Sequence, residues 1–266
     1  MIDFHNHVLP EVDDGSKSLE ISLCMLKNAE EQGITNVVNT VHFQHPKVEF
    51  NEITHQRISD SINKLQDELE NHKINVTLHI GAEVFFLPNL VDLKADPLAT
   101  FGDGKYMLIE FHIHHIPEIQ KQVLFDLKMS GVTPIIAHPE RYRQVQEDIT
   151  LAYDWLNAGC LLQVDAGSVL GYLGSGAQVT SEAIIKNNWC QILASDAHDS
   201  DRRNFCLKDA YEIVRDWVGD NVRSMIFDNP LAVLEGKPIS IDIDNIPEEN
   251  PGFWGKLFYR SKNRVV

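Results

Sequence analysis

Short apolar segments alternate along the chain with segments whose apolar residues recur at helical spacing. The apolar segments are too uniformly hydrophobic to have one wet face, so we expect strands that are buried on both faces. The helical pattern is clear where Leu19, Leu23 and Leu26 share one face and Gly33 provides a stop. Predicted strands span residues 2–7, 36–41, 75–82, 106–111, 133–137, 160–165 and 191–195. Predicted helices lie near residues 18–32, 52–71, 118–130, 146–158, 178–188 and 206–218.

This alternation of strands and helices predicts an α/β fold with a parallel sheet covered by helices. Roughly seven strand–helix units are too many for a small flavodoxin-like sheet. Polar residues that follow the first and last strands meet only if the sheet closes on itself. We therefore expect a distorted, TIM-like barrel.

Composition is consistent with one large domain that needs no disulfides. The chain has 266 residues, of which 43% are hydrophobic, and its four cysteines form no Cys-x-x-Cys pair. We expect reduced cysteines and a cytoplasmic location, since the chain shows no basic leader and no apolar run of membrane-spanning length. The formal net charge of -16 disfavours nucleic acid as a partner.

Imidazoles and carboxylates follow the predicted strands at the point where each strand ends. The pair His5 and His7 falls on one side of a strand, because side chains alternate with a period of two. One such pair is usually structural, but Asp196 and His198 repeat the spacing after the last strand. Because the carboxyl ends of parallel strands converge, these residues predict one polynuclear metal site. The candidate ligands are His5, His7, Asp14, His42, Glu83, Glu110, His138, Asp196 and His198.

The ligand types restrict the metal without selecting one. Imidazole nitrogens together with carboxylate oxygens suit manganese, iron or zinc. A strand-end carboxylate such as Glu83 or Glu110 would be unfavourable if buried unpaired, so neutralisation by a metal ion is expected.

Several longer motifs resemble one known family. They are Met1-Ile-Asp-Phe-His-Asn-His7, Glu11-Val-Asp-Asp-Gly15, Gly81-Ala-Glu83, Ile109-Glu110-Phe111, Ala137-His-Pro-Glu-Arg-Tyr142 and Ala194-Ser-Asp-Ala-His198. Together they resemble the polymerase and histidinol phosphatase (PHP) superfamily, over about residues 1–235. The Val-Asp-Asp-Gly and His-Pro-Glu-Arg-Tyr segments are most similar to its manganese-dependent tyrosine-protein phosphatases of bacterial capsule and exopolysaccharide loci.

The resemblance implies a distorted (β/α)7 barrel of the PHP fold with three divalent metal ions, expected as Mn²⁺, with Fe, Zn, Co and Mg as alternatives. It places the first ion on His5, His7, Glu83 and Asp196, the second on Glu83, Glu110 and His138, and the third on Asp14, His42 and His198. It also implies two phosphate-binding arginines, matched here by Arg141 and Arg203. The family commonly has glycine before the second arginine, whereas this chain has Arg202-Arg203.

The chemistry expected from such a site is phosphomonoester hydrolysis. Metal ions lower the pKa of bound water to near neutrality and hold phosphate oxygens, and arginines take up the remaining charge. No cysteine is followed six positions later by arginine, which excludes the Cys-x5-Arg thiolate mechanism. A proton for the leaving phenolate can come from Asp14, Asp199, Asp201 or water.

Two histidine- or glycine-rich segments are assigned to the barrel mouth rather than to metal or phosphate binding. Residues 111–115 follow the Glu110 strand, and residues 171–176 lack the Lys-Ser/Thr ending of a phosphate loop. The histidines His45, His55, His72 and His79 are expected to be ordinary surface or core residues.

The predicted domains are a catalytic barrel over 1–238 and a tail over 239–266. Residues 251–264 hold four aromatic and four basic residues with no acid, which indicates either a flexible or domain-packing tail or a segment that docks on anionic lipid or a membrane-bound kinase. The expected substrate is a phosphorylated bacterial tyrosine kinase, which would place the enzyme at the inner face of the membrane. A small-molecule phosphoesterase such as histidinol-phosphatase and a non-catalytic PHP regulatory module are the alternatives.

Overall fold

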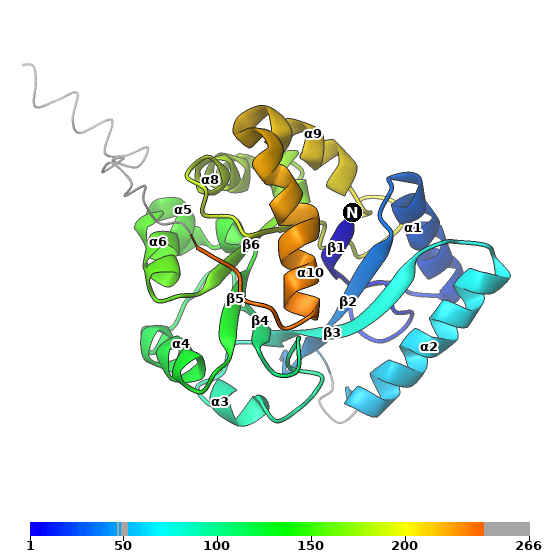
Figure 1. The fold of residues 1–266 in the computed structure, drawn as a ribbon, viewed down its shortest axis with the longest axis horizontal. Coiled ribbons are helices and arrows are strands. Elements are labelled where there is room, and N and C mark those ends of the chain that lie inside the picture. Colours follow the sequence, from blue (N-terminus) through cyan, green and yellow to red (C-terminus); the bar gives the residue numbers. More distant parts are fainter. Residues whose placement is uncertain (47, 49–52, 242–266) are drawn as a thin grey trace, which may run out of the picture.

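A computed structural model describes residues 1–46, 48 and 53–241 of the chain (Figure 1). Seven parallel strands form one sheet in sequence order, so the predicted α/β barrel and its strands are confirmed. The strands are β1 (Ile2–Asn6), β2 (Asn36–Phe43), β3 (Thr77–Phe85), β4 (Tyr106–Glu110), β5 (Thr133–Ala137), β6 (Leu161–Asp165) and β7 (Ile192–Ala194).

Helices surround the barrel, as Figure 1 shows. The long ones are α1 (Leu19–Glu31), α2 (His55–Asn71), α4 (Gln120–Met129), α6 (Thr150–Asn157), α8 (Ser175–Lys186) and α9 (Leu207–Val218). The shorter ones are α3 (Leu90–Leu93), η2 (Pro139–Arg141), α5 (Arg143–Glu147), α7 (Ala166–Val169), η3 (Gly219–Asn221), η4 (Ser224–Asp228) and α10 (Asn229–Leu234). The helix predicted near 146–158 is present as α6, but it starts later than predicted, because Asp148 separates it from α5 and accepts hydrogen bonds from the backbone N–H and hydroxyl of Thr150.

The barrel closes between β1 and the segment that follows β7. The N–H of His7 donates to the carbonyl of Ala197 at 2.8 Å, and the N–H of Asp196 donates to the carbonyl of His5 at 2.8 Å. These two backbone hydrogen bonds join the two residue pairs that the sequence singled out at opposite ends of the chain. Closure is therefore what brings their side chains into one site.

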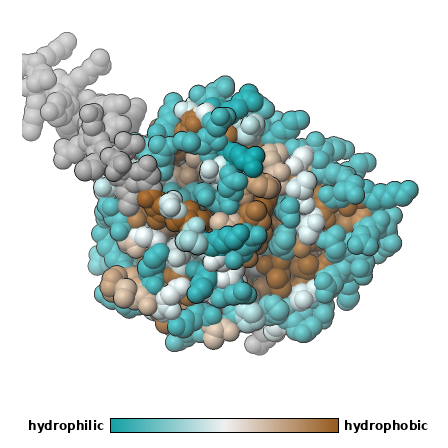
Figure 2. All heavy atoms as spheres, in the orientation of Figure 1, coloured by the Kyte–Doolittle hydropathy of each residue, from teal (hydrophilic) through white to brown (hydrophobic). Residues whose placement is uncertain are grey.

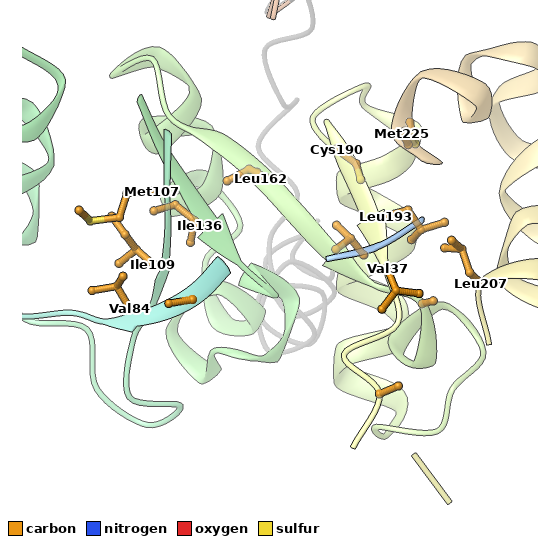
Figure 3. Packing of buried hydrophobic residues seen from close by; sticks show 14 of the residues in the cluster. Val37, Val84, Met107, Ile109, Ile136, Leu162, Cys190, Leu193, Leu207 and Met225 are labelled. Carbon is orange, nitrogen blue, oxygen red and sulfur yellow. The ribbon is translucent and has the colours of Figure 1, made fainter. Parts of the chain in front are cut away.

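Each strand directs one set of side chains into the barrel and the other toward the helices. On β4, Tyr106 and Leu108 belong to the cluster inside the barrel, whereas Met107 and Ile109 belong to the outer cluster drawn in Figure 3. Glu110 follows with the inward spacing at the carboxyl end of the strand. The inward face is thus apolar along most of the strand and polar where the strand ends.

Helix α10 lies across the end of the barrel where the strands begin (Figure 1). Val233 is buried in the inner cluster, and Ile239 and Ile241 pack against it from the segment after the helix. The hydroxyl of Tyr106 donates to the carbonyl of Lys237 and fixes that segment. Figure 2 shows hydrophilic residues over most of this face, with an apolar area at its centre. The site is therefore at the opposite end, where the strands finish.

Packing thus continues through Ile241, beyond the predicted barrel boundary at residue 238. The aromatic and basic part of the tail falls within residues 242–266, which lie outside the described residues. Among the helices of the described part of the chain, none has the length and apolar character needed to cross a membrane.

Candidate metal centre

All nine candidate ligands lie together where the strands end. Four overlapping groups each bring three or four ligand atoms to within 4.8 Å of one another. The groups are His5, His7 and Asp196; His5, Glu83 and His138; His42, Glu83 and Glu110; and His7, Asp14, His42 and His198. Because His5, His7, His42 and Glu83 each belong to two groups, the residues form one continuous site.

The backbone conformation at two of these positions is unusual. His138 follows β5 with φ of 33°, and Asp196 follows β7 with φ of 47°. Residues other than glycine rarely adopt this left-handed region, and where they do it often marks a functional site. At both positions the chain leaves the strand abruptly and turns a ligand toward the barrel axis.

Glu83 lies at the centre of the site. Its carboxylate oxygens are 2.9 Å from Nε2 of His138 and 3.0 Å from Nδ1 of His42, and Nε2 of His5 is 3.4 Å away. Burial alone would raise the pKa of Glu83, but the surrounding imidazoles, His5 foremost, hold that pKa well below its ordinary value. A fully buried glutamate is therefore kept ionised and can bridge metal ions.

The site contains polar atoms that the described protein atoms leave without hydrogen bonds. Within the part of the chain that the structure describes, these buried atoms include Nε2 of His5 and His7, Nδ1 of His42, Oε2 of Glu110 and Oδ1 of Asp196. Burial and the nearby charge of Glu83 raise the pKa of Glu110 to about 8. Imidazole lone pairs and crowded carboxylates are the donor set of a divalent metal centre, so the residues present fit bound metal.

Two further residues with buried side chains hold the imidazoles in place, and sequence reasoning missed both. The carboxylate of Asp13 is 2.8 Å from Nδ1 of His7 and accepts the backbone N–H of His42 at 3.0 Å. Oε1 of Gln163, on β6, is 2.8 Å from Nδ1 of His5. Such partners fix which imidazole nitrogen faces the metal. The available signal was a polar residue inside an otherwise apolar strand, for Gln163, and the first acid of Val-Asp-Asp-Gly, for Asp13.

Gly15 is required by the close approach of the loop that carries Asp13 and Asp14. A Cβ at this position would lie 2.2 Å from the carbonyl oxygen of His7 and 2.4 Å from its Cβ. Only glycine lets the loop fold over β1, so Gly15 in this motif has a steric reason.

Both predicted phosphate-binding arginines reach the site, and both contact Asp196. Nη1 of Arg141 is 2.5 Å from Oδ2 of Asp196, and Nη2 of Arg203 is 2.7 Å from the same oxygen. Arg202 is exposed. Nη1 of Arg141 also lies 3.6 Å from Oδ2 of Asp165, a buried carboxylate that the sequence analysis did not select. Burial, followed by the charge of Asp196, raises the pKa of Asp165 to about 7.

One histidine that we expected to be an ordinary residue lies beside the site. The ring of His45 is buried and stacks on that of His42, with centroids 4.6 Å apart, and its Nε2 is 3.7 Å from Oε2 of Glu110. His79, by contrast, lies on β3, where Nε2 is 2.8 Å from Oδ1 of Asn36. His112, His114 and His115 are exposed in the loop after β4.

The cysteines take no part in the site. All four are free, and three of them are buried. Burial raises the pKa of the Cys160 and Cys190 thiols to about 12. These thiols are therefore neutral and unsuited to nucleophilic attack near pH 7.

Known proteins are similar to this chain in both sequence and fold. YwqE of Bacillus subtilis, named a tyrosine-protein phosphatase, is 31% identical over 242 residues, covering 90% of this chain and 93% of YwqE. CapC of Staphylococcus aureus is 33% identical over 212 residues, covering 79% and 82%. One crystal structure comes from a study of YwqE and of CpsB from Streptococcus pneumoniae, both described as metal-dependent tyrosine phosphatases. It superposes with a TM-score of 0.86 at 30% identity, covering 94% of this chain and all of the other.

A more distant likeness supports the fold alone. The phosphotriesterase homology protein of Escherichia coli superposes with a TM-score of 0.55 at 11% identity, over 88% of this chain and 98% of that protein. The family model for capsular polysaccharide synthesis, CpsB/CapC, matches residues 1–235. The chain therefore belongs to the CpsB/CapC family of capsular polysaccharide synthesis.

Proposed function

We propose that this chain is a metal-dependent protein-tyrosine phosphatase that acts on a bacterial tyrosine kinase controlling polysaccharide synthesis. The observation that carries the proposal is the juxtaposition, around Asp196, of the unpaired ligand atoms on one side and two guanidinium groups on the other. The unpaired ligand atoms suit divalent metal ions, and the guanidinium groups suit the oxygens of a phosphate. Membership of a family whose named relatives are tyrosine phosphatases supports the same reaction.

Three divalent ions, Mn²⁺ by preference, are assigned to the ligands. His5, His7, Glu83 and Asp196 would hold one, Glu83, Glu110 and His138 a second, and Asp14, His42 and His198 a third. In support, Asp14, His42 and His198 share one ligand group and His5, His7 and Asp196 share another, while His138 and Glu110 each share a group with Glu83. Bound ions supply activated water and positive charge for the phosphate oxygens.

The protein side chains orient the substrate and the ligands. Arg141 and Arg203 would bind the phosphoryl oxygens in bidentate fashion. One nitrogen of each guanidinium contacts Asp196, so each arginine would divide its N–H groups between Asp196 and the substrate. Asp13 and Gln163 keep the imidazoles of His7 and His5 directed at the metals. Asp14, Asp199, Asp201 or a metal-bound water would supply the proton for the leaving oxygen, and Asp14 has 49% of its side chain exposed to solvent.

The kinase substrate implies action in the cytoplasm at the inner face of the membrane. The barrel predicted over residues 1–238, with Ile239 and Ile241 packed against it, would catalyse the reaction, and the remainder of the predicted tail over 239–266 would bring it to the kinase or to anionic lipid. The composition of residues 251–264 supports this role.

The test compares substrates and metals on one preparation. Protein purified without chelator is analysed for metal, and its turnover of a phosphotyrosine peptide is compared with that of histidinol phosphate. We expect Mn²⁺-dependent turnover of the peptide and little turnover of histidinol phosphate. Preference for histidinol phosphate would reassign the substrate, and no turnover with Mn, Fe, Zn, Co or Mg would reject a catalytic role.

A further inference from the structure

Two segments beside the proposed centre have no acidic residue, although the chain holds 39 Asp and Glu against 23 Lys and Arg. Residues 111–117 follow β4, and residues 166–181 follow β6; the second segment has no Lys or Arg either. Because β4, β5 and β6 are neighbours, these segments lie on either side of η2, which follows β5 and carries Arg141. The phosphate-binding arginine is thus flanked by two surfaces that do not repel an anion.

Each segment exposes a large apolar side chain in its loop part, and the second segment also exposes Val179 in α8. Ile113 is 38% exposed and Tyr172 is 63% exposed. The other exposed large hydrophobic residues of the described chain belong to α4, with its N-cap, and to α8 on the outer wall: Ile119, Phe125, Met129 and Val179. Ile113 and Tyr172 are therefore the members of this set that lie in loops following strands, where a barrel binds its substrates.

Contacts connect both loops to the arginine segment. A Cβ on Gly167 would be 3.8 Å from Cδ2 of Tyr172, and the N–H of Gly167 donates to Asp165 at 2.7 Å. Asp165 in turn lies 3.6 Å from Nη1 of Arg141. On the other side, the carbonyl of Ile113 accepts the N–H of Arg143 at 3.2 Å. Both loops are anchored next to the arginine while their apolar side chains face solvent.

We propose that Ile113 and Tyr172 form a docking rim for the polypeptide that carries the phosphotyrosine. The inference rests on the proposed phosphatase function and specifies its substrate class: a protein segment with aliphatic or aromatic residues beside the phosphotyrosine. Asp165 and Gly167 separate Tyr172 from Arg141, so the Tyr172 ring contacts the flanking residues rather than the phosphorylated ring itself. An exposed tyrosine suits this role, because it offers a large contact area with few rotatable bonds.

The experiment measures kcat/KM on two substrates: a peptide with leucine on both sides of phosphotyrosine, and p-nitrophenyl phosphate. For Tyr172→Ala we expect the peptide-to-aryl ratio of kcat/KM to fall about fivefold, mainly through the peptide KM, as loss of one aromatic contact predicts. Tyr172→Phe should restore the ratio, and Ile113→Ala should lower it as an independent variant. Phe125→Ala is the matched control, since Phe125 is 53% exposed on α4, and it should leave both values unchanged.

The outcomes separate this inference from the proposed function. If the wild-type protein with metal hydrolyses the peptide and neither Tyr172→Ala nor Ile113→Ala changes the ratio, the rim is rejected while the phosphatase function stands. An equal loss on both substrates would also reject it, because it would show a general effect on catalysis or folding. If the wild-type protein hydrolyses no phosphotyrosine substrate, the proposed function fails and the rim fails with it.

Discussion

Arg203 donates from Nη2 to Oδ2 of Asp196 at 2.7 Å, while the other oxygen of Asp196 is directed at the imidazoles of His5 and His7, 3.4 Å from each Nε2. One carboxylate thus separates the arginine side of the site from the metal side. In the proposed mechanism, an arginine held on this carboxylate would be pre-positioned beside the metal ligands before phosphate binds, which would reduce the ordering needed at binding.

The contact between Arg203 and Asp196 predicts that replacing Arg203 lowers catalysis much more than replacing the adjacent Arg202. Arg203→Ala should lower kcat/KM by an amount equivalent to about 2 to 4 kcal/mol of transition-state stabilisation, because one phosphate-binding guanidinium is lost. Arg202 is exposed, so Arg202→Ala should have little effect and serves as the matched control. Metal analysis of both variants should give wild-type content. A crippled Arg202→Ala together with an unaffected Arg203→Ala would show that the wrong arginine was assigned.

Much of this site could be predicted from the sequence because its residues occupy positions that local patterns define. The end of each apolar strand is visible in the sequence, and the inward spacing of residues such as Glu110 follows from the two-residue period of a strand. Parallel strands then bring these positions together. Arg203 was selected over Arg202 only through the family resemblance, and the structure places Arg203 on Asp196.

The residues that were missed depend on contacts between distant segments. Gln163 bonds to His5 across 158 positions, and no local pattern marks it as a partner of that imidazole. His45 lies beyond the end of β2, and its Nε2 is 3.7 Å from Oε2 of Glu110 at the end of β4, a contact between segments far apart in the sequence. Helix α10 covers the end of the barrel where the strands begin, and no local sequence pattern predicts its packing on β1.

Removal of metal should abolish activity. The unpaired ligand atoms of His5, His7 and Asp196 imply that the protein side chains alone do not complete the site. Exhaustive treatment with a chelator should therefore reduce turnover to background, and Mn²⁺ or a similar ion should restore it. Vanadate should not inhibit with the potency seen for thiolate phosphatases. Full activity in protein verified to be free of metal would rule out this mechanism.

Asp13 predicts a variant that weakens metal binding without removing a ligand. In Asp13→Ala, His7 loses the partner of Nδ1 and the backbone of His42 loses an acceptor, so metal affinity should fall about 10- to 100-fold. Asp13→Asn should lose less metal affinity, since the amide oxygen can still accept one hydrogen bond. Glu11→Gln, at an exposed position in the same loop, is the control. Titration calorimetry with Mn²⁺ measures the effect; unchanged affinity in Asp13→Ala would remove the positioning role.

Replacement of Gly81, inside the barrel, by alanine is predicted to destabilise the fold. A Cβ at this position would lie 2.2 Å from Cε1 of Phe101, whose ring is buried in the inner cluster and cannot swing into solvent. Gly81→Ala should therefore lower the free energy of unfolding by about 1 to 3 kcal/mol, the usual range for overpacking. Gly176→Ala is the control, because its close neighbour is the end of the flexible Gln146 side chain. Urea unfolding distinguishes them, and equal stability of the two variants would contradict the packing argument.

The tail predicts a separation between catalysis and recruitment. Phe253, Trp254 and Phe258 offer apolar side chains for a membrane interface, and Lys256 and Arg260 belong to a set of four basic residues that each contribute about 1 kcal/mol beside anionic lipid. Deleting residues 251–266 should therefore preserve turnover of a small aryl phosphate while weakening binding to anionic vesicles or to the kinase.

The salt dependence of this binding provides the control, because electrostatic attraction to lipid weakens as ionic strength rises, whereas turnover of a small substrate in the barrel should change far less. Vesicle and kinase binding that is equal for the full-length and truncated proteins would reject the docking role. Loss of aryl phosphate turnover on truncation would instead show that these residues contribute to the fold of the barrel.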